Sequence, residues 1–557
     1  MKYRSFEEFF LVPLRNGLTK PKRVRGEGYK MVNMGELFKY SRMKNIPMDR
    51  VPLNEKEYLS SMVVAGDLLF ARQSLVLEGA GQCSIFIEDA EEVCFESHLI
   101  RCRLNKKIAN PLFYYYFFSS KLGKQVINAI VEQGAGAAGI RGSDLSKVLV
   151  PDIDIVTQNN IVRVVDNIDS KIEFNRQINQ TLESMAQAIF QSWFVDFDPV
   201  KAKIAAREQW QTFTDDERTE WLNELLDTQD YFKTCLLELT AKAGLSDDEN
   251  VQLESSFDLI SCRGHGPESS ESLDIGLNNL RKEWQSKKVG PALQNASETL
   301  YLNIAAMTAI SSRNETSLAA MPVEEFSQLY KTASLFPERL VDSELGEIPE
   351  GWRVGTLGGL IEFNPRRTLK KGTVAPYLDM KNVPTSGHLA DEVFDRELGS
   401  GTKFINGDTL LARITPCLEN GKTAFVDFLE DNQVGWGSTE YIVMRPKANY
   451  PVSLGYFIAR NEEFRQHAVQ SMTGTSGRQR ANSKALEGLD WLAYPIELLL
   501  EFDKLSGHYL KVARTNGDQN KSLSMIRDSL LPKLLSGELD VSSLTELSDI
   551  DPAAMDV

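Results

Sequence analysis

Two glycine-containing segments are the strongest candidates for phosphate chemistry in this sequence. Gly421-Lys422-Thr423 ends like a phosphate-binding loop, but the pattern G-x-x-x-x-G-K-[ST] requires a glycine where Pro416 stands. Proline has no backbone N–H to offer a phosphate, so nucleotide binding at Lys422 is not expected. The segment Gly134-Ala135-Gly136-Ala137-Ala138-Gly139 lacks the strand, helix and acidic residue of a dinucleotide-binding fingerprint, and we interpret it as a flexible or tightly turning loop.

The remaining polar residues form no complete catalytic constellation. We find neither the Asn/Asp-Pro-Pro-aromatic motif of amino-methyltransferases nor a clustered acid-plus-lysine nuclease pattern, and serine, histidine and aspartate occur without a nucleophile elbow. The six cysteines form no C-x-x-C pair and the five histidines form no H-x-x-x-H, so neither a zinc site nor a disulfide framework is expected. The sequence therefore predicts a chain without catalytic residues, metal or cofactor of its own.

Basic residues on expected loops are the features that favour a binding role. In the first part of the chain they are Lys20, Lys22, Arg23, Arg25, Arg72 and Arg141, and in the second part Arg366, Arg367, Lys370, Lys371, Arg413, Arg478 and Arg480. Arginine forks suit both phosphates and guanine edges, and a glycine-rich loop such as residues 474–480 lets a backbone approach a duplex closely. For a single arginine, a solvated charge or a local ion pair is the simpler interpretation, whereas the clusters together favour DNA.

The net charge of −16 does not argue against nucleic acid, because the acidic residues are concentrated. Residues 200–337 carry a net charge of −9 and residues 538–557 a net charge of −6, which leaves −1 for the rest of the chain. The N-terminus MKYRSFEEFF has no signal-peptide core, and no stretch approaches the ~20 apolar residues of a membrane span. We expect a cytoplasmic protein with no membrane association.

A long-period repeat indicates the elements that position these residues. Gly66-Asp67-Leu68-Leu69-Phe70-Ala71-Arg72 matches Gly407-Asp408-Thr409-Leu410-Leu411-Ala412-Arg413 at an offset of 341 residues. At that same offset Val93, Phe95 and Ser97 fall on Val434, Trp436 and Ser438. Short apolar runs broken by glycine within each copy predict two compact α+β domains of about 150 residues.

Each repeated domain is followed by a long helical pattern with apolar residues at heptad spacing. The first series is Ile161, Ile168, Asn175, Leu182 and Ile189, with companions Val164, Ile178 and Met185; the second is Phe502, Tyr509, Asn516, Leu523 and Leu530, with companions Leu505, Val512 and Ile526. A lone asparagine at the middle of an apolar seam usually fixes register, so Asn175 and Asn516 are predicted register residues of a coiled coil. The alternative is that each helix packs only on its own domain.

Several phrases resemble the specificity subunit of type I restriction-modification systems. They are NRQINQTLE at residues 175–183, AIFQSWFVDFDP at 188–199, ELGEIPEGW at 344–352, TPCLENGK at 415–422 and LPKLLSGEL at 531–539. Together they occur across nearly the whole chain outside residues 200–335. The departure is the acidic helical segment, which is longer than the linker expected at that place.

The resemblance implies a non-catalytic DNA reader with an α+β fold: two globular target-recognition domains in a pseudo-twofold arrangement, joined by two long helices that form an antiparallel coiled coil, plus a helical insertion. The expected boundaries are 1–155 and 338–495 for the domains, 156–199 and 496–537 for the helices, 200–337 for the insertion and 538–557 for an acidic tail. The implied partners are double-stranded DNA, two methyltransferase subunits and restriction subunits. S-adenosylmethionine, ATP and Mg²⁺ are expected on those partner subunits and none of them on this chain. The alternative is a coiled-coil adaptor without a DNA role.

Antiparallel helices have two consequences for this sequence. Asn175 and Asn516 are each central in their series, so their amides are expected to meet at mid-length and bond each other. The two domains differ in sequence, so the DNA site is expected to be two unlike short words separated by a spacer that is not read. The 28 residues from Ile161 to Ile189 extend over about 42 Å, which is comparable with one duplex turn of ~34–36 Å.

Overall fold

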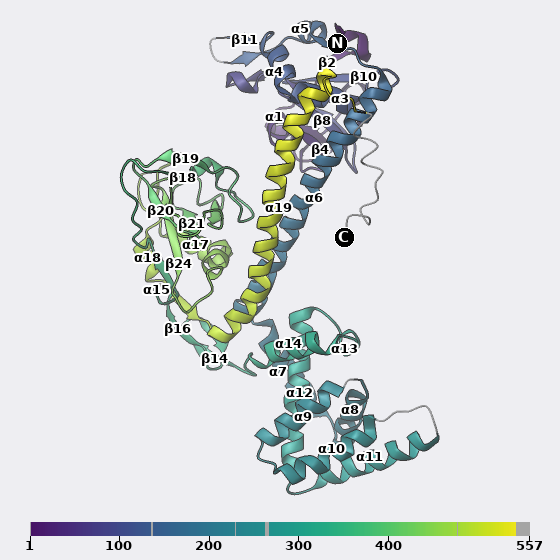
Figure 1. The fold of residues 1–557 in the computed structure, drawn as a ribbon, viewed down its shortest axis with the longest axis vertical. Coiled ribbons are helices and arrows are strands. Elements are labelled where there is room, and N and C mark those ends of the chain that lie inside the picture. The colour runs from purple at the N-terminus through teal and green to yellow at the C-terminus, as the bar shows by residue number, and fades with distance from the viewer. Residues whose placement is uncertain (1, 135–136, 229, 262–266, 476, 542–557) are drawn as a thin grey trace. The chain divides into compact units, whose positions relative to one another are not determined.

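The computed structural model describes residues 2–134, 137–228, 230–261, 267–475 and 477–541. The chain divides into two compact units. The first unit contains the residues up to Arg176 and those from Gly517 onward, and the second contains Gln177–Asn516. Each unit holds one sheet-rich domain and part of each of two long helices, and the second unit also holds a group of shorter helices (Figure 1).

The first β-domain is built on a five-stranded sheet in the order β2-β10-β6-β8-β4. Its central strand β6 (Leu68–Ala71) is buried at every position, as its uninterrupted apolar sequence requires. Smaller sheets have the orders β5-β3-β9, β11-β12-β7 and β1-β13. The strands are β1 (Tyr3–Ser5), β2 (Phe10–Asn16), β3 (Tyr29–Val32), β4 (Arg42–Lys44), β5 (Asp49–Val51), β7 (Gln73–Ser74), β8 (Cys83–Glu88), β9 (Val93–Phe95), β10 (Leu99–Leu104), β11 (Glu132–Gln133), β12 (Ala138–Gly139) and β13 (Leu149–Pro151).

Short helices complete the first β-domain and enclose its aromatic core. They are η1 (Phe6–Phe9), η2 (Lys22–Val24), α1 (Met34–Lys39), α2 (Glu55–Ser61), η3 (Leu77–Gly79), α3 (Pro111–Ser119), α4 (Lys121–Asn128) and α5 (Gly142–Lys147). Helix α3 begins at Pro111 after the N-cap Asn110, whose side chain accepts hydrogen bonds from two backbone N–H groups. Its residues from Phe113 to Phe118 are all buried, which makes α3 the centre of the core.

The second β-domain repeats the central part of this topology, with four strands in its main sheet where the first domain has five. Its main sheet has the order β17-β24-β21-β22, its second sheet β19-β18-β23-β20, and β16 pairs with β25 as β1 pairs with β13. The strands are β16 (Arg353–Thr356), β17 (Ile361–Phe363), β18 (Val374–Leu378), β19 (Phe394–Glu397), β20 (Thr402–Phe404), β21 (Thr409–Ala412), β22 (Thr423–Phe425), β23 (Gly435–Gly437), β24 (Tyr441–Pro446) and β25 (Asp490–Ala493). The helices are α15 (Leu357–Leu360), η4 (Met380–Asn382), α16 (Leu454–Arg460), α17 (Glu462–Gln470) and α18 (Ser483–Glu487). The expected pair of α+β domains is confirmed.

A buried carboxylate occupies the same place in both β-domains. Asp67 accepts two hydrogen bonds of 2.7 Å from Arg103, and its repeat Asp408 lies 3.3 Å from Arg445. Both carboxylates have no exposed side-chain surface, so each depends on an arginine to offset the cost of burial.

The two long helices are α6 (Ile155–Phe194) and α19 (Ile496–Ser536), and they run antiparallel within each unit. In the first unit Asp169 bonds Arg527 and Asn175 bonds Asn520; in the second, Phe190 packs on Phe502. The same helices also contribute to the domain cores, since Ile161 and Leu534 lie in the first core and Phe190 and Leu498 in the second. Each helix therefore pairs with its neighbour and also packs on a β-domain, so the two interpretations of the heptad pattern are both partly correct.

Some details of the expected helix interface are wrong. Asn175 does not bond Asn516: Asn175 donates to Gln519 Oε1 at 2.7 Å and Asn520 Oδ1 at 2.9 Å, whereas Asn516 donates to Asn179 Oδ1 at 2.8 Å. The helices are shifted by four residues relative to the expected register. Asn175 therefore faces Asn520, and Asn516 faces Asn179, each one helical turn from the partner that was predicted. The companion residues Met185, Leu505 and Ile526 are 44%, 39% and 47% exposed, so the buried seam is narrower than the heptad pattern predicts.

The acidic segment folds as a helical subdomain of the second unit. Its helices are α7 (Asp198–Thr212), α8 (Asp215–Thr228), α9 (Asp230–Lys242), α10 (Asp247–Ser261), α11 (Pro267–Gln285), α12 (Gly290–Ser311), α13 (Glu315–Ala319) and α14 (Val323–Ser334). They enclose a core of their own that includes Trp210, Leu236 and Leu300. A hairpin of β14 (Leu340–Ser343) and β15 (Gly346–Pro349) leads into the second β-domain. The segment is therefore a packed structure and not a loose linker.

Candidate nucleic-acid interface

In the first β-domain, basic residues follow two strands that stop at the same end of the main sheet. Strands β2 and β6 both pair antiparallel with β10, where Asn16 faces Ile100 and Ala71 faces Leu99. The chain leaves β2 toward Lys22, Arg23 and Arg25, and it leaves β6 directly at Arg72. The last residues of both strands thus face the first residues of β10, which places the starts of both basic segments side by side.

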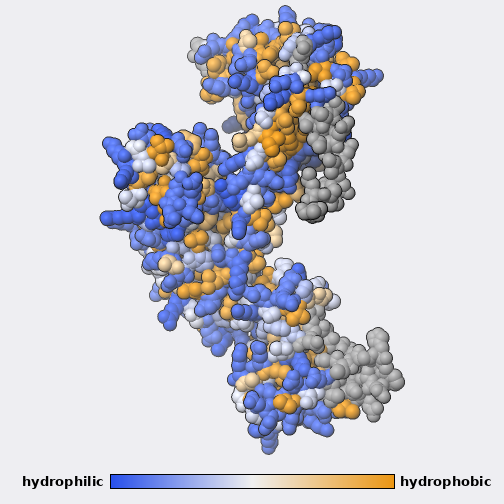
Figure 2. All heavy atoms as spheres, viewed as in Figure 1, coloured by the Kyte–Doolittle hydropathy of each residue, from blue (hydrophilic) through white to orange (hydrophobic). Residues whose placement is uncertain are grey.

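The second β-domain presents a similar arrangement, in which β21 ends opposite the first residue of β24 and β17 ends opposite its fourth. Strands β17 and β21 flank β24, with Phe363 facing Met444 and Ala412 facing Tyr441. The segment after β17 carries Arg366, Arg367, Lys370 and Lys371, and the residue after β21 is Arg413. We call this end of each main sheet the basic edge. Figure 2 shows hydrophilic side chains over much of the visible face of this domain.

A glycine-rich loop joins each basic edge through equivalent hydrogen bonds. The N–H of Ile140 donates to Arg72 O at 2.9 Å, and the N–H of Ala481 donates to Arg413 O at 2.8 Å. Ile140 and Ala481 are related by the offset of 341 residues, as Arg72 and Arg413 are. The loops that end in Arg141 and Arg480 are therefore held beside the strand-end arginine in both domains. Residues 135, 136 and 476 of these loops lie outside the described residues.

The basic edge of the first domain borders an open groove of about 1070 Å³. The groove is lined by Arg15, Arg72 and Arg141, together with the acidic residues Glu7 and Glu132. Arg15 is exposed near the end of β2 and was missed in the sequence analysis, because its strand carries no other basic residue to mark it. A sequence signal could have identified Arg15. Exposed and half-buried residues alternate along β2, Arg15 stands at one of the exposed positions, and the strand leads into a basic loop.

Several of the predicted residues are ion-paired within their own domain. Lys20 contacts Glu57 at 2.8 Å, Arg25 contacts Asp49 at 3.0 Å, Arg141 contacts Glu132 at 2.7 Å, Arg367 contacts Asp408 at 3.1 Å and Arg480 contacts Glu440 at 2.7 Å. Of these carboxylates only that of Asp408 is fully buried, so Arg367 stabilises the fold more directly than the others. In the other four pairs both side chains are at least 14% exposed.

Other predicted residues make no ion pair or side-chain hydrogen bond among the described residues. They are Lys22, Arg23, Arg72, Arg366, Lys370, Lys371 and Arg478, and each is exposed. Long cationic side chains at loop positions are suited to bind phosphates, which position a protein on a duplex without reading its sequence. The predicted set thus separates into exposed cations without a side-chain partner among the described residues and cations that an acid already holds.

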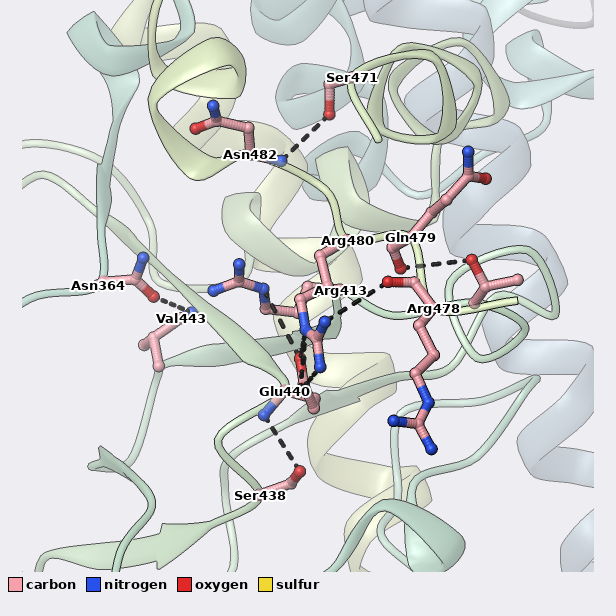
Figure 3. A network of polar contacts seen from close by, with 11 residues as sticks. Asn364, Arg413, Ser438, Glu440, Val443, Ser471, Arg478, Gln479, Arg480 and Asn482 are labelled. Atoms are coloured by element: carbon pink, nitrogen blue, oxygen red, sulfur yellow. Dashed lines mark hydrogen bonds and ion pairs between the residues drawn. The ribbon is translucent and has the colours of Figure 1, made fainter. Parts of the chain in front are cut away.

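Figure 3 shows the orienting contacts at the second basic edge. Both oxygens of Glu440 accept from the Arg480 guanidinium, at 2.7 to 3.0 Å, and Arg413 Nε lies 3.9 Å from the same carboxylate. The hydrogen bonds from Arg480 lower the pKa of the Glu440 carboxyl below its ordinary value, so Glu440 is ionised at neutral pH. The side chain of Arg478 extends away from this network.

The Lys422 side chain is hydrogen-bonded to the backbone of a neighbouring segment. Its ammonium donates to the carbonyl oxygens of Met380, at 2.6 Å, and Lys381, at 3.2 Å. Nearby, the Arg460 guanidinium bonds the carbonyls of Thr385 and Gly421 at 2.9 and 2.8 Å. The TPCLENGK segment is therefore tied to neighbouring loops, with its lysine directed to backbone oxygens.

Two further findings concern metals and membranes. Within the described residues, no group of three or more histidine, cysteine, aspartate or glutamate side chains is arranged to hold a metal ion. A search of the same residues finds no helix with the length and apolar character needed to cross a bilayer.

The fold and its basic edges define a class of protein with two repeated α+β domains, each continued by a long helix. Residues 7–184 match the family described as type I restriction modification DNA specificity domain. The specificity subunit of the type I restriction enzyme HindI from Haemophilus influenzae is 21% identical over 85% of this chain and 86% of its own. That of EcoAI from Escherichia coli is 30% identical over 26% of this chain and 25% of its own.

Among solved structures, the type I restriction-modification S subunit from M. genitalium aligns with 96% of this chain and 95% of its own, at 12% identity and a TM-score of 0.39. The family match covers most of the first β-domain and most of α6, and the HindI subunit matches most of the chain. The chain is thus similar to type I restriction-modification specificity subunits over most of its length, and its first part matches their DNA specificity domain.

Proposed function

We propose that this chain supplies the DNA sequence specificity of a type I restriction-modification complex and reads a bipartite, asymmetric site with its two β-domains. The observation that carries the proposal is the repeated basic edge, at which two strand ends and a glycine-rich loop bring cations together in both domains. The two edges carry different side chains, which favours two unlike half-sites. Arginines held by acids are suited to base edges, and exposed cations are suited to phosphates.

The same proposal assigns catalysis to other subunits. Two methyltransferase subunits would bind S-adenosylmethionine, and restriction subunits would use ATP and Mg²⁺ for cleavage. This chain would scaffold them without contributing a catalytic group. Purified alone, it should neither methylate nor cut DNA, and methyl transfer by the chain free of partners would contradict this part of the proposal.

Duplex binding by the purified complex tests the DNA role against the alternative of an adaptor. A reader that uses these cations should bind duplex DNA with an affinity that falls steeply between about 50 and 200 mM salt, because phosphate contacts release counterions. An adaptor without a DNA role would show no such binding beyond that of its partner subunits. The matched control is the set of partner subunits assembled without this chain.

A further inference from the structure

Glu440 and Arg480 are held in place by the backbone on both sides of their ion pair. The N–H of Glu440 donates to Ser438 Oγ at 3.1 Å, and its carbonyl accepts from the Arg413 N–H at 2.9 Å. The N–H of Arg480 donates to Thr473 O at 2.9 Å and its carbonyl accepts from the Thr473 N–H at 3.0 Å. The side-chain contact therefore joins two rigid backbone positions and leaves the guanidinium a single orientation (Figure 3).

This ion pair contributes little to the stability of the domain. The Arg480 and Glu440 side chains are 41% and 23% exposed, and ion pairs that solvent reaches are screened. The structural need for an acid at this position is therefore small, in contrast to the buried Asp408 on the same domain. What the carboxylate does supply is geometry: both of its oxygens engage one planar fork.

The carboxylate also offsets positive charge where cations are crowded. Arg413, Arg478 and Arg480 all lie on or beside the glycine-rich loop, and Arg478 is exposed without an ion pair among the described residues. A cation whose charge is not neutralised by a nearby anion binds the phosphates of any DNA sequence, and each such contact increases the salt dependence of binding. An anion fixed beside two of these arginines opposes phosphate binding there and leaves the outer faces of the forks for base edges.

The first β-domain has a different residue at the equivalent place. The N–H of Arg72 donates to His98 O at 2.8 Å, as that of Arg413 donates to Glu440 O. His98 therefore stands where Glu440 stands, and Arg72 is exposed with no ion pair among the described residues. The two basic edges thus differ in charge at a matched position.

We propose that Glu440 is a positioning residue for sequence reading by the second β-domain: it fixes the Arg480 fork beside Arg413 and opposes phosphate binding at both arginines. The inference rests on the proposed function and deepens it. It concerns only the half of the DNA site that the second β-domain reads.

The test uses the full chain assembled with its methyltransferase subunits. The variants are Glu440→Gln, which keeps the shape, Glu440→His, which introduces the residue of the first domain, and Glu440→Asp, which keeps the charge. Glu430→Gln is the matched control. Glu430 is an exposed acid, and the carbonyl of its neighbour Leu429 accepts a hydrogen bond from Asn406. Asn406 precedes β21, so Glu430 lies at the end of the sheet opposite to the basic edge. Two quantities are measured for each: the methylated sequence in a host genome, and the salt dependence of binding to a random-sequence duplex.

Glu440→Gln and Glu440→His should relax one half of the methylated sequence, with discrimination reduced by about tenfold or more at the affected base pairs. Binding to random duplex should strengthen by roughly five- to tenfold near 0.1 M salt, with a salt slope steeper by about one for each freed arginine. Glu440→Asp should keep the shallower slope, and Glu430→Gln should match the unaltered complex in both measurements.

Three results would overturn the inference. An unchanged methylated sequence in Glu440→Gln would show that the ion pair has no part in reading. Loss of a single base preference without stronger random binding would make Glu440 a direct base contact and not a positioning residue. Relaxation of both halves together would indicate general damage to the chain. A distinct result, an unaltered complex that methylates no fixed sequence, would contradict the proposed function itself.

Discussion

The Asn175 side chain donates a hydrogen bond to Asn520 Oδ1 at 2.9 Å, and Asn175 has no exposed surface. In the second unit Asn516 makes the equivalent bond to Asn179 at 2.8 Å. By the repeat offset of 341, Asn516 corresponds to Asn175 and Asn520 to Asn179. The contact between Asn175 and Asn520 and the contact between Asn516 and Asn179 are therefore equivalent under the repeat.

Breaking the first of these contacts should destabilise the helix pair. Asn175→Leu removes the hydrogen bonds that the buried Asn175 amide donates to the half-buried Asn520 and the exposed Gln519, at a cost of about 0.5–1.5 kcal/mol for each bond. In thermal unfolding of the full chain, Asn175→Leu and Asn520→Leu should be coupled by roughly 0.5–3 kcal/mol. Asn175→Leu and Asn516→Leu bond different partners and should be additive. The reverse pattern, coupling only in the second pair, would restore the register expected from the heptad series.

Arg478 should act through phosphate. Because its side chain is exposed and directed away from the Glu440 network, Arg478→Ala should weaken duplex binding to the same extent for all sequences and reduce the salt slope by about one. Lys447→Ala is the control, since Lys447 is exposed just beyond the opposite end of β24. A change in the methylated sequence with an unchanged salt slope would identify Arg478 as a base contact.

Arg367 should matter more for stability than for DNA. It contacts the fully buried carboxylate of Asp408, which keeps a second contact to Arg445. Arg367→Ala should lower the free energy of unfolding by roughly 1.5–3 kcal/mol, the range for hydrogen bonds to charged groups. The neighbouring exposed Arg366→Ala should leave stability unchanged. Urea unfolding measures both, and equal stability of the two variants would show that Arg367 is a surface cation.

Lys203 should make the stability of the helical subdomain increase with pH above about pH 8. The Lys203 side chain is buried against the carbonyl of Phe336, and burial lowers its pKa from 10.5 to about 8. The unfolded chain then binds more protons than the folded chain between these values, so the cost of the buried charge is present below about pH 8 and is relieved as pH rises to 10.5. Over that window the free energy of unfolding of the natural chain should rise relative to that of Lys203→Met, by at most about 3 kcal/mol. A difference that stays constant from pH 7 to 10.5 would place the ammonium in water.

The repeat was the part of the fold that the sequence could reveal. Gly66–Arg72 and Gly407–Arg413 predict two equivalent domains, because the same buried strand and the same arginine after it recur at one offset. The heptad series predicts two long helices but not their register, since the stagger depends on how each helix end packs in a domain core. Nothing in the charge of residues 200–337 indicated that their apolar residues would gather into a separate core.

The candidate site was predicted in location but not in chemistry. The positions of the basic clusters follow from strand ends, which sequence patterns mark. The acids that hold Arg367, Arg480 and Arg25 lie 41, 40 and 24 residues away along the chain. Only the folded sheets bring these groups together, so sequence alone could not separate an oriented arginine from a free one. Arg15 was missed for the related reason that its groove exists only in the fold.

Methylation mapping by long-read sequencing tests the central claim most directly. A host that carries this chain together with its methyltransferase subunits should methylate one asymmetric sequence, made of two unlike words separated by a spacer that is not read. The same host without this chain should lack that methylation. Identical methylation with and without the chain would contradict the claim that its two β-domains read DNA. A palindromic site with equal halves would contradict the claim that the two domains read unlike words.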